Sequence, residues 1–407
     1  MTEKKKTGFE TLAKASFAPQ EQMLAVKKKK NSFFIGLPKE ISLQENRITL
    51  TPDEVELLVN NGHEIWIETK AGVGSKFSDQ QYSEAGAKIV YSPQEVYKAD
   101  FILKIEPPTE EEIELMHPGQ TLISALQLGH LRTEQVQALL KKKITALGFE
   151  LIEDKVGGMP IIRAMSEIAG STVMSIASEY LSSTNNGKGV ILGGITGVPP
   201  TKVVIIGAGT VAEFAARAAL GLGADVQIFD NHLYKLRRIK HIIGQQLYTS
   251  TIDTITLGDT LKTADVVIGA LRAEKGKVRH VVTEEMVSKM KPDSLIIDLS
   301  IDQGGCVETS EITTLKKPVF RKHDVIHYCV PNVASRVAHS ATNALSNIFT
   351  PTILRAAEEG GIEEMIFLHK WFMKGVYTYK GGLTNEAVAR KFGLKHKNIE
   401  LLLAARF

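Results

Sequence analysis

The 407-residue sequence contains only two cysteines, has an aromatic content of only 6%, and lacks any apolar run long enough to cross a membrane. Cys306 and Cys329 do not form a CxxC pair, so we expect neither a disulfide framework nor a metal site, and reduced thiols are typical of a cytoplasmic protein. The hydrophobic content of 43% is sufficient for a large core, and the length predicts two to three domains.

Positive charge is concentrated at the start of the chain. Residues 1–32 carry eight Lys and three Glu, which gives this segment a net charge of +5. Because the whole chain has a net charge of +3, the remainder has a net charge of −2 and is slightly acidic. A basic face for nucleic acid on the folded body is therefore not expected. The Lys-rich segment has no long apolar stretch of the kind that a secretory signal requires. We expect a solvated tail or a helix lying on the body, and the alternative is an arm that binds nucleic acid or an anionic surface.

From residue 32 onward, short apolar segments alternate with helical patterns, which predicts an α/β fold with parallel sheets. The predicted strands are Ser32–Leu37, His63–Glu68, Lys88–Val90, Phe101–Ile105, Thr121–Leu126, Lys143–Gly148, Lys202–Ile206, Asp225–Phe229, Asp265–Gly269, Ser294–Ser300 and Val325–Cys329. Long helical patterns over Ile161–Ser183 and Ala334–Glu359 flank the second group of strands. We therefore predict two Rossmann-like domains, with the second inserted into the first. The predicted boundaries are 1–32 for the extension, 33–160 and 339–407 for a substrate domain, and 161–338 for a nucleotide domain.

A nucleotide-binding motif follows the buried strand Lys202–Ile206. Here Gly207, Gly209 and Ala212 form a G-x-G-x-x-A turn that opens a helix, with Thr210 and Val211 between them. Gly207 permits the tight turn, and Gly209 allows the backbone to approach a pyrophosphate at the helix N-terminus. We assign these residues, with Thr210 and Val211, to a dinucleotide.

A carboxylate after the next strand indicates which dinucleotide is bound. Asp230 lies 23 positions after Gly207, where it can accept hydrogen bonds from ribose hydroxyls and repel a 2′-phosphate, so NAD is favoured over NADP. Lys235 either contacts the ribose or is an exposed helix residue. Polar and glycine-rich segments after two further strands, near Asp302 and Asn332, are expected at the same crevice.

The sequence from about Phe34 to the C-terminus resembles the alanine dehydrogenase family, which includes the nucleotide-binding subunit of transhydrogenases. The matching motifs, besides the G-x-G-x-x-A turn, are IGLPKE (Ile35–Glu40), ENR (Glu45–Arg47), MSEIAG (Met165–Gly170), GGITGV (Gly193–Val198), IDQGGC (Ile301–Cys306), YCVPN (Tyr328–Asn332) and the C-terminal Lys374–Ala389. The resemblance implies two domains around a cleft, oxidative deamination of L-alanine to pyruvate and ammonium with NAD, and a homo-oligomer, either a hexamer or a dimer.

The resemblance also implies roles for particular residues. Arg47 matches the arginine that holds the substrate carboxylate, a task that the guanidinium fork suits. Asp302 matches the aspartate beside the nicotinamide, where it can assist proton transfer. Ser166 and Asn332 match positions that contact the cofactor.

Two positions depart from the family pattern. Glu106 stands where the family has a lysine that polarises the substrate carbonyl, and Gln127 stands where it has a catalytic histidine. A carboxylate at position 106 repels a carboxylate substrate unless it is protonated or paired, and Gln127 cannot exchange a proton near pH 7. Lys104 either reaches the same cleft or pairs with Glu106. His130 either replaces the histidine or is a surface residue.

We therefore weigh three functions. The first is an NAD-dependent oxidoreductase that acts on an amino or keto acid, with Lys104, Glu106 and Gln127 at the catalytic positions. The second is an NAD-binding protein without this activity, because the lysine and histidine are absent. The third is half of a hydride-transfer complex, as in transhydrogenase. It is disfavoured because the C-terminal segment Lys374–Ala389 resembles that of alanine dehydrogenases and because membrane segments are lacking.

Overall fold

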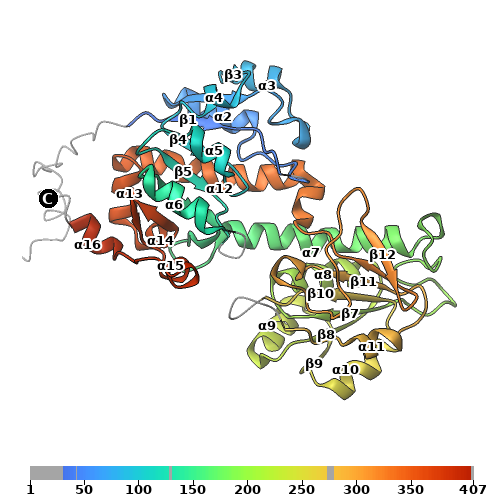
Figure 1. The fold of residues 1–407 in the computed structure, drawn as a ribbon. Coiled ribbons are helices and arrows are strands. Elements are labelled where there is room, and N and C mark those ends of the chain that lie inside the picture. Colours follow the sequence, from blue (N-terminus) through green and yellow to red (C-terminus); the bar gives the residue numbers. More distant parts are fainter. Residues whose placement is uncertain (1–30, 43, 128–130, 273–278, 405–407) are drawn as a thin grey trace, which may run out of the picture.

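The computed structural model describes residues 31–42, 44–127, 131–272 and 279–404, which form two α/β units (Figure 1). The Lys-rich extension and His130 lie outside the described residues. Within the described part of the chain, none of the helices has both the length and the apolar character that a membrane span requires.

The first unit contains an eight-stranded sheet with the order β15-β14-β6-β5-β4-β1-β2-β3. Its strands are β1 (Phe34–Leu37), β2 (Glu64–Glu68), β3 (Lys88–Val90), β4 (Phe101–Leu103), β5 (Thr121–Ser124), β6 (Thr145–Gly148), β14 (Val376–Tyr379) and β15 (Gly382–Leu383). The strands β1 to β6 run parallel, whereas β14 pairs antiparallel with β6. The C-terminal segment thus completes the sheet that the N-terminal segment begins.

The second unit contains a seven-stranded sheet with the order β12-β13-β11-β10-β7-β8-β9. Its strands are β7 (Lys202–Ile206), β8 (Asp225–Phe229), β9 (Tyr248–Ser250), β10 (Val266–Gly269), β11 (Leu295–Asp298), β12 (Val319–Lys322) and β13 (Val325–Tyr328). Only β12 is antiparallel to its neighbour within this sheet. In both sheets the first strand lies beside the fourth, so each has a topological switch point where ligands bind in doubly wound folds.

Helices cover both faces of each sheet because alternate strand residues point to opposite sides. In the first unit, Phe101 and Leu103 belong to one apolar cluster and Ile102 to another. The helices of this unit are α2 (Pro52–Asn60), α3 (Asp79–Glu84), α4 (Pro93–Val96), α5 (Glu110–Leu115), α6 (Thr133–Lys141), α13 (Ile362–Leu368), α14 (Lys370–Met373), α15 (Glu386–Phe392) and α16 (Ile399–Ala404), with the 3-10 turns η1 (Val73–Ser75) and η2 (Phe149–Leu151). Those of the second unit are α8 (Thr210–Gly221), α9 (Leu233–Ile243), α10 (Thr254–Leu261) and α11 (Glu284–Ser288), with η3 (Ser183–Asn185), η4 (Ile301–Gln303) and η5 (Val333–Val337).

Two long helices connect the units: α7 (Pro160–Leu181) leads into the second, and α12 (Ala338–Glu359) returns to the first (Figure 1). Helix α7 packs closely on α8, and Gly170 permits this approach, because a Cβ there would lie 2.4 Å from the carbonyl oxygen of Val211. This close packing fixes the position of Ser166, which lies one turn earlier on α7, relative to the glycine-rich turn.

Candidate active site

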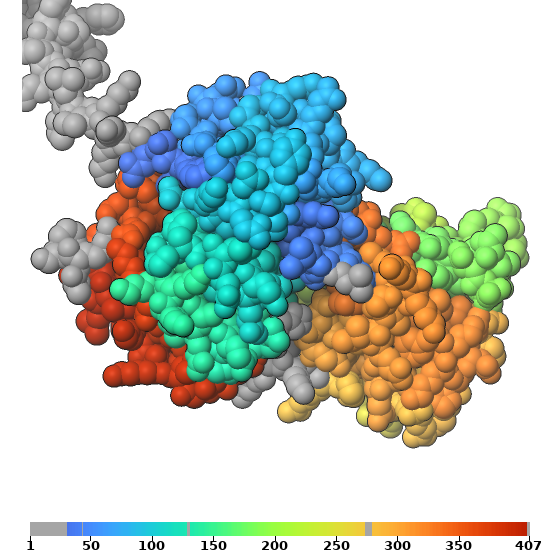
Figure 2. All heavy atoms as spheres, turned by 45° about the horizontal axis from the view of Figure 1, so that its top comes forward, coloured from blue at the N-terminus to red at the C-terminus, as the bar shows by residue number. Residues whose placement is uncertain are grey.

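A cleft of about 650 Å³ lies beside the carboxyl ends of strands of the second sheet, and Arg47 of the first unit also lines it. Figure 2 shows early residues of the first unit, in dark blue, lying against the orange part of the second. Eight of the residues predicted from sequence line this cleft, namely Arg47, Ser166, Gly209, Thr210, Val211, Lys235, Asp302 and Asn332. The other predicted residues, Lys104, Glu106, Gln127, Gly207 and Asp230, lie outside the lining of the cleft.

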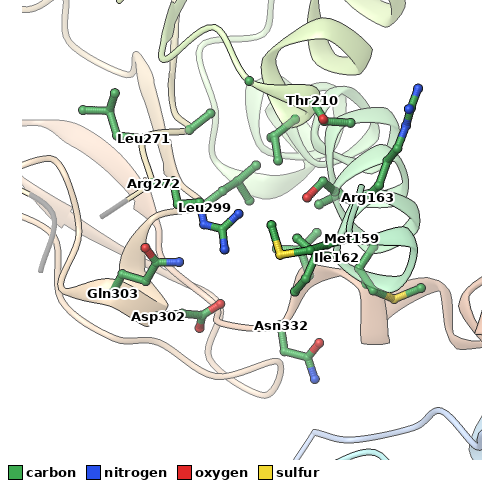
Figure 3. Close-up of a pocket in the computed structure, with 18 of the residues that line it drawn as sticks. Met159, Ile162, Arg163, Thr210, Leu271, Arg272, Leu299, Asp302, Gln303 and Asn332 are labelled. Atoms are coloured by element: carbon green, nitrogen blue, oxygen red, sulfur yellow. The ribbon is translucent and has the colours of Figure 1, made fainter. Parts of the chain in front are cut away.

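The glycine-rich turn forms one wall of the cleft. Gly207 has φ +115°, and a Cβ at this position would lie 2.4 Å from the carbonyl oxygen of Ala270. At Gly209, in contrast, a Cβ would have no atom within 4 Å. No side chain caps the N-terminus of α8 at Gly209, so the first N–H groups of this helix remain available to an anion. Thr210, at the start of α8, points into the cleft (Figure 3). The turn fits the pyrophosphate of a dinucleotide.

Asp230 directly follows β8 and has an exposed fraction of only 3%. Its Oδ2 accepts a hydrogen bond from the backbone N–H of Ala208 at 2.8 Å, and its Oδ1 accepts one from the backbone N–H of His232 at 2.8 Å. The carboxylate therefore holds the glycine-rich turn against β8. Its contact with a ribose stays a prediction.

Several cations in the cleft were missed by reasoning from sequence. Arg163 on α7, Arg238 on α9 and Arg272 after β10 all line it. Arg238 follows Lys235 by three positions, so the helical period could have placed both on one face. Its guanidinium donates to the carbonyl oxygen of Ala208 at 3.2 Å and lies 3.5 Å from Glu213. These cations favour a polyanionic ligand such as a dinucleotide.

Asp298 organises the loop that carries Asp302. It is buried at the end of β11, and its carboxylate accepts hydrogen bonds from the backbone N–H groups of Ser300, Cys306 and Val307 and from the Ser310 hydroxyl, all within 3.2 Å. The loop turns at Gly304 and Gly305, which both have positive φ. The short η4 turn thereby presents Asp302 and Gln303 to the cleft (Figure 3).

Arg47 is held at the cleft by Glu45. The Arg47 Nε and Nη2 donate to the two Glu45 carboxylate oxygens at 2.8 and 2.6 Å, and Nη1 contacts the Met165 sulfur at 3.2 Å. Asn332 reaches over from the second unit and donates its side-chain amide to Glu45 at 2.7 Å. Burial works to raise the pKa of Glu45, but Arg47 and the Asn332 amide outweigh it, so the pKa of Glu45 is lowered. Glu45 belongs to the ENR motif, but the sequence alone indicates no role for it.

Glu106 follows β4, and its carboxyl lies in the field of Glu45, Arg47 and Glu40. Burial and the negative charge of Glu45 raise the pKa of Glu106 to about 7, although Arg47 opposes this shift. The backbone N–H of Glu106 donates to Glu40 at 3.4 Å. The uncharged form of Glu106 therefore becomes the main form as pH falls below about 7, and in this form the residue does not repel a carboxylate substrate.

Lys104 is buried away from the cleft, with an exposed fraction of 1%. Its ammonium hydrogen-bonds Glu112 at 3.0 Å and lies 3.5 Å from Glu40. Burial alone would lower the pKa of Lys104, but these two carboxylates raise it. The partners of Lys104 are thus Glu40 and Glu112, rather than Glu106.

Gln127 follows β5 with φ +41°, an uncommon conformation for this residue type. Its backbone N–H donates to Glu150 at 2.8 Å, and the Tyr377 hydroxyl donates to the same carboxylate at 2.7 Å. Tyr377 belongs to β14, so the C-terminal strand supports the loop at this position.

Two doubly wound units, with a glycine-rich turn and a cleft at the carboxyl ends of strands of the second sheet, define this chain as a dinucleotide-binding protein of the two-domain α/β class. Comparison with known proteins then gives the family. Residues 36–169 match the model of the N-terminal domain of alanine dehydrogenase/PNT, and residues 173–386 match that of the C-terminal domain. The chain belongs to the alanine dehydrogenase/PNT family, as the motifs predicted.

Individual relatives agree over nearly the whole chain. It is 39% identical over 370 residues to an alanine dehydrogenase of Bacillus subtilis, a match that covers 91% of this chain and 97% of the relative. It is 38% identical over 369 residues to alanine dehydrogenase 2 of Staphylococcus aureus, covering 90% and 98%. A solved L-alanine dehydrogenase superposes with a TM-score of 0.83 at 35% identity, covering 88% of this chain and 99% of the other, which confirms the predicted fold class.

Proposed function

We propose that this protein is an NAD-dependent oxidoreductase of the alanine dehydrogenase type. It would convert L-alanine or a related amino acid to the 2-oxo acid and ammonium. The observation that carries the proposal is that Arg47 and Asp302 line the same cleft as Gly209 and the start of α8. The family membership and the 39% identity to an alanine dehydrogenase support the same function.

The residues present fit NAD. The open face at Gly209 and the uncapped start of α8 would hold the pyrophosphate, and Asp230 would stand near the ribose, while Ser166, Thr210, Val211, Lys235 and Asn332 would complete the contacts. When bound, NAD supplies the acceptor for the substrate hydride. Arg47 would hold the substrate carboxylate, and Asp302 would stand beside the reacting carbon.

The test is NADH oxidation with pyruvate and ammonium, extended to a panel of 2-oxo acids. NADH binding is measured separately by fluorescence. We expect saturable binding and turnover with at least one 2-oxo acid. Binding without turnover on the whole panel would overturn the proposal and favour the NAD-binding protein without activity.

A double variant, Glu106→Lys with Gln127→His, tests whether the substrate has changed. The negative charges of Glu40 and Glu45 raise the pKa of Glu106, so the same two carboxylates would stabilise the ammonium of a lysine at this position. If activity with pyruvate appears only in this variant, the natural chain acts on a different acid.

We also propose the domain boundaries given above, a cytoplasmic location and a homo-oligomeric assembly, dimeric or hexameric. The two described cysteines are both free and buried, which agrees with a reducing compartment. Light scattering of the purified full chain would give the oligomeric state.

A further inference from the structure

The order of strands in the second sheet gives the order of residues along the cleft. The strands β11, β10, β7 and β8 are consecutive neighbours, and they are followed by Asp302, Arg272, the glycine-rich turn and Asp230 respectively. Neighbouring strands lie about 4.8 Å apart, so these four segments succeed one another along one edge of the sheet. With the pyrophosphate at the start of α8 and the adenosine ribose near Asp230, the nicotinamide half of NAD would extend toward β10 and β11. Arg272 and Asp302 therefore lie on the side where the substrate would react.

The turn that carries Arg272 is held between its two neighbours. The backbone N–H of Ala270 donates to the carbonyl oxygen of Ile206 at 2.8 Å, and the backbone N–H of Leu299 donates to that of Gly269 at 2.9 Å. The chain thus leaves β10 bonded on one side to β7 and on the other to the segment after β11. Arg272 follows Ala270 by two positions and lines the cleft (Figure 3), so the sheet sets its place relative to the glycine-rich turn.

Cations outnumber acids on the described lining of the cleft. Among these described residues five are cations and one is an acid, namely Arg47, Arg163, Lys235, Arg238, Arg272 and Asp302. Three of the arginines are paired with glutamates at 2.6, 3.0 and 3.5 Å: Arg47 with Glu45, Arg163 with Glu167 and Arg238 with Glu213. Arg272, in contrast, forms no hydrogen bond or ion pair with another residue that the structure describes. Because a guanidinium stays charged and suits the two oxygens of one carboxylate, Arg272 can accept an anion from a ligand.

The cofactor alone does not supply this anion. Both phosphates of a dinucleotide would lie at the start of α8, and Lys235 and Arg238 stand on that side of the cleft because α9 follows β8. The nicotinamide ring of oxidised NAD is itself a cation. With this cofactor and alanine in the cleft, Arg272 would face a positive ring and a methyl group, and an unpaired charge is costly where water is excluded. A second carboxylate on the substrate would remove this cost.

The two arginines that a substrate would meet come from different units. Arg47 follows β1 of the first unit, and its Nη1 contacts the Met165 sulfur, a weak acceptor that a substrate carboxylate could replace. Arg272 follows β10 of the second unit. If Arg47 takes the carboxylate attached to Cα, Arg272 is left for a group at the other end of the same molecule.

We propose that Arg272 binds the side-chain carboxylate of the substrate, so that the amino acid oxidised here is a dicarboxylic one. The inference rests on the proposed function, because it takes NAD to occupy the cleft and Arg47 to hold the carboxylate on Cα. It names the substrate class and leaves the reaction as proposed above.

Matched acids and amides test this assignment on the purified full chain. L-Aspartate is compared with L-asparagine, and L-glutamate with L-glutamine, by the reduction of NAD, with L-alanine as the reference. The members of each pair have nearly the same shape and differ in side-chain charge. We expect kcat/KM for at least one acid to exceed the values for its amide and for L-alanine about 10- to 100-fold, the range that a hydrogen bond between charged groups gives.

Variants of Arg272 show whether this residue causes the preference. Arg272→Leu should bring the ratio of acid to amide close to one, and Arg272→Lys, which keeps the charge but not the planar fork, should keep part of it. Arg163→Leu is the matched control, because Arg163 lines the same cleft from α7 but is paired with Glu167, so the ratio should not change. NADH affinity is measured for each variant by fluorescence. An unchanged ratio in Arg272→Leu would overturn the proposal, and weaker NADH binding in that variant would then assign Arg272 to the cofactor.

A dead-end complex separates this inference from the proposed function. L-Malate and L-2-hydroxybutyrate, and likewise L-2-hydroxyglutarate and L-2-hydroxypentanoate, are titrated by calorimetry into the NADH complex. These hydroxy acids are already reduced, so they cannot accept hydride from NADH. We expect at least one diacid to bind about tenfold or more tightly than its monoacid partner in wild type and in Arg163→Leu, and equally with it in Arg272→Leu.

The outcomes distinguish the two ideas. Equal binding of diacid and monoacid by wild type would overturn the role of Arg272. Oxidation of alanine or another monocarboxylic amino acid without any preference for the acids would also overturn it, while the proposed function stands. If no amino acid is oxidised but a diacid preference that depends on Arg272 is measured, the oxidoreductase function fails and the diacid site stands.

Discussion

Asn332 donates its side-chain amide to Glu45 across the cleft at 2.7 Å, although 287 positions separate the two residues in sequence. Asn332 has a left-handed backbone (φ +56°), a conformation that glycine also adopts readily. The two units therefore meet at a carboxylate that also holds Arg47.

Replacing Asn332 by glycine should raise the KM for a 2-oxo acid about tenfold, with a smaller change in kcat. The substitution keeps the backbone conformation but removes a hydrogen bond to a charged group, which contributes about 1.5 kcal/mol or more. Steady-state kinetics provide the measurement. Ser335→Ala, which removes a neighbouring contact with the backbone of Asn46, is the control. An unchanged KM in Asn332→Gly would contradict the role of the amide.

Gly207 and Gly209 should respond differently to substitution by alanine. A Cβ at Gly207 meets the Ala270 carbonyl at 2.4 Å and requires a positive φ, so we expect Gly207→Ala to lower the free energy of unfolding by about 1–3 kcal/mol. At Gly209 the Cβ enters open space. Gly209→Ala should therefore keep the stability of wild type and weaken NADH binding at least tenfold. Equal NADH affinity in Gly209→Ala and wild type would place the pyrophosphate elsewhere.

Asp230→Asn should raise the Kd for NADH about tenfold or more. The amide can place a donor against the N–H group of Ala208, where the carboxylate now accepts, and this disturbs the glycine-rich turn as well as the ribose site. Asp225→Asn, at the opposite end of β8, is the matched control. Fluorescence titration is the measurement, and unchanged affinity in Asp230→Asn would show that the ribose assignment is wrong.

Lys104→Met should reduce stability rather than turnover. Removing the buried ammonium leaves Glu40 and Glu112 without their cation, and breaking such a pair costs about 3–5 kcal/mol. Urea unfolding gives the free energy, and the double variant Lys104→Met, Glu112→Gln should recover part of it. A large loss of kcat at unchanged stability would instead indicate that Lys104 acts in catalysis.

Much of the fold could be predicted from sequence because buried parallel strands appear as short apolar runs. Lys202–Ile206 and Asp225–Phe229 match β7 and β8 in both bounds. The strands β14 and β15 were missed, although β14 is buried, because the return of the chain to the first sheet was predicted without any strand. The strands β9 and β12 were also missed, since they lie at the edges of the second sheet, are partly exposed and lack a continuous apolar pattern. Burial on both faces, which gives the strongest pattern, is absent there.

The site was predictable where its geometry is local. The turn from Gly207 to Thr210 depends on consecutive residues, so a motif describes it. The arrangement of Glu45, Arg47, Glu106 and Asn332 depends instead on three loops brought together by two sheets. Sequence reasoning identified Arg47, Glu106 and Asn332 singly, but it could not show that Glu45 joins them.

The return of the chain to its first sheet has a consequence for the order of folding during synthesis. All strands of the second sheet lie within Lys202–Tyr328, whereas β6 of the first receives its neighbour β14 only from Val376–Tyr379. At about 5–20 residues per second, ribosomes need roughly 10–50 s to deliver β14 after β6. We therefore expect the inserted unit to fold first, while β6 is still an open edge on the nascent chain. Truncation before residue 376 should then leave a folded nucleotide-binding unit attached to an aggregation-prone partner.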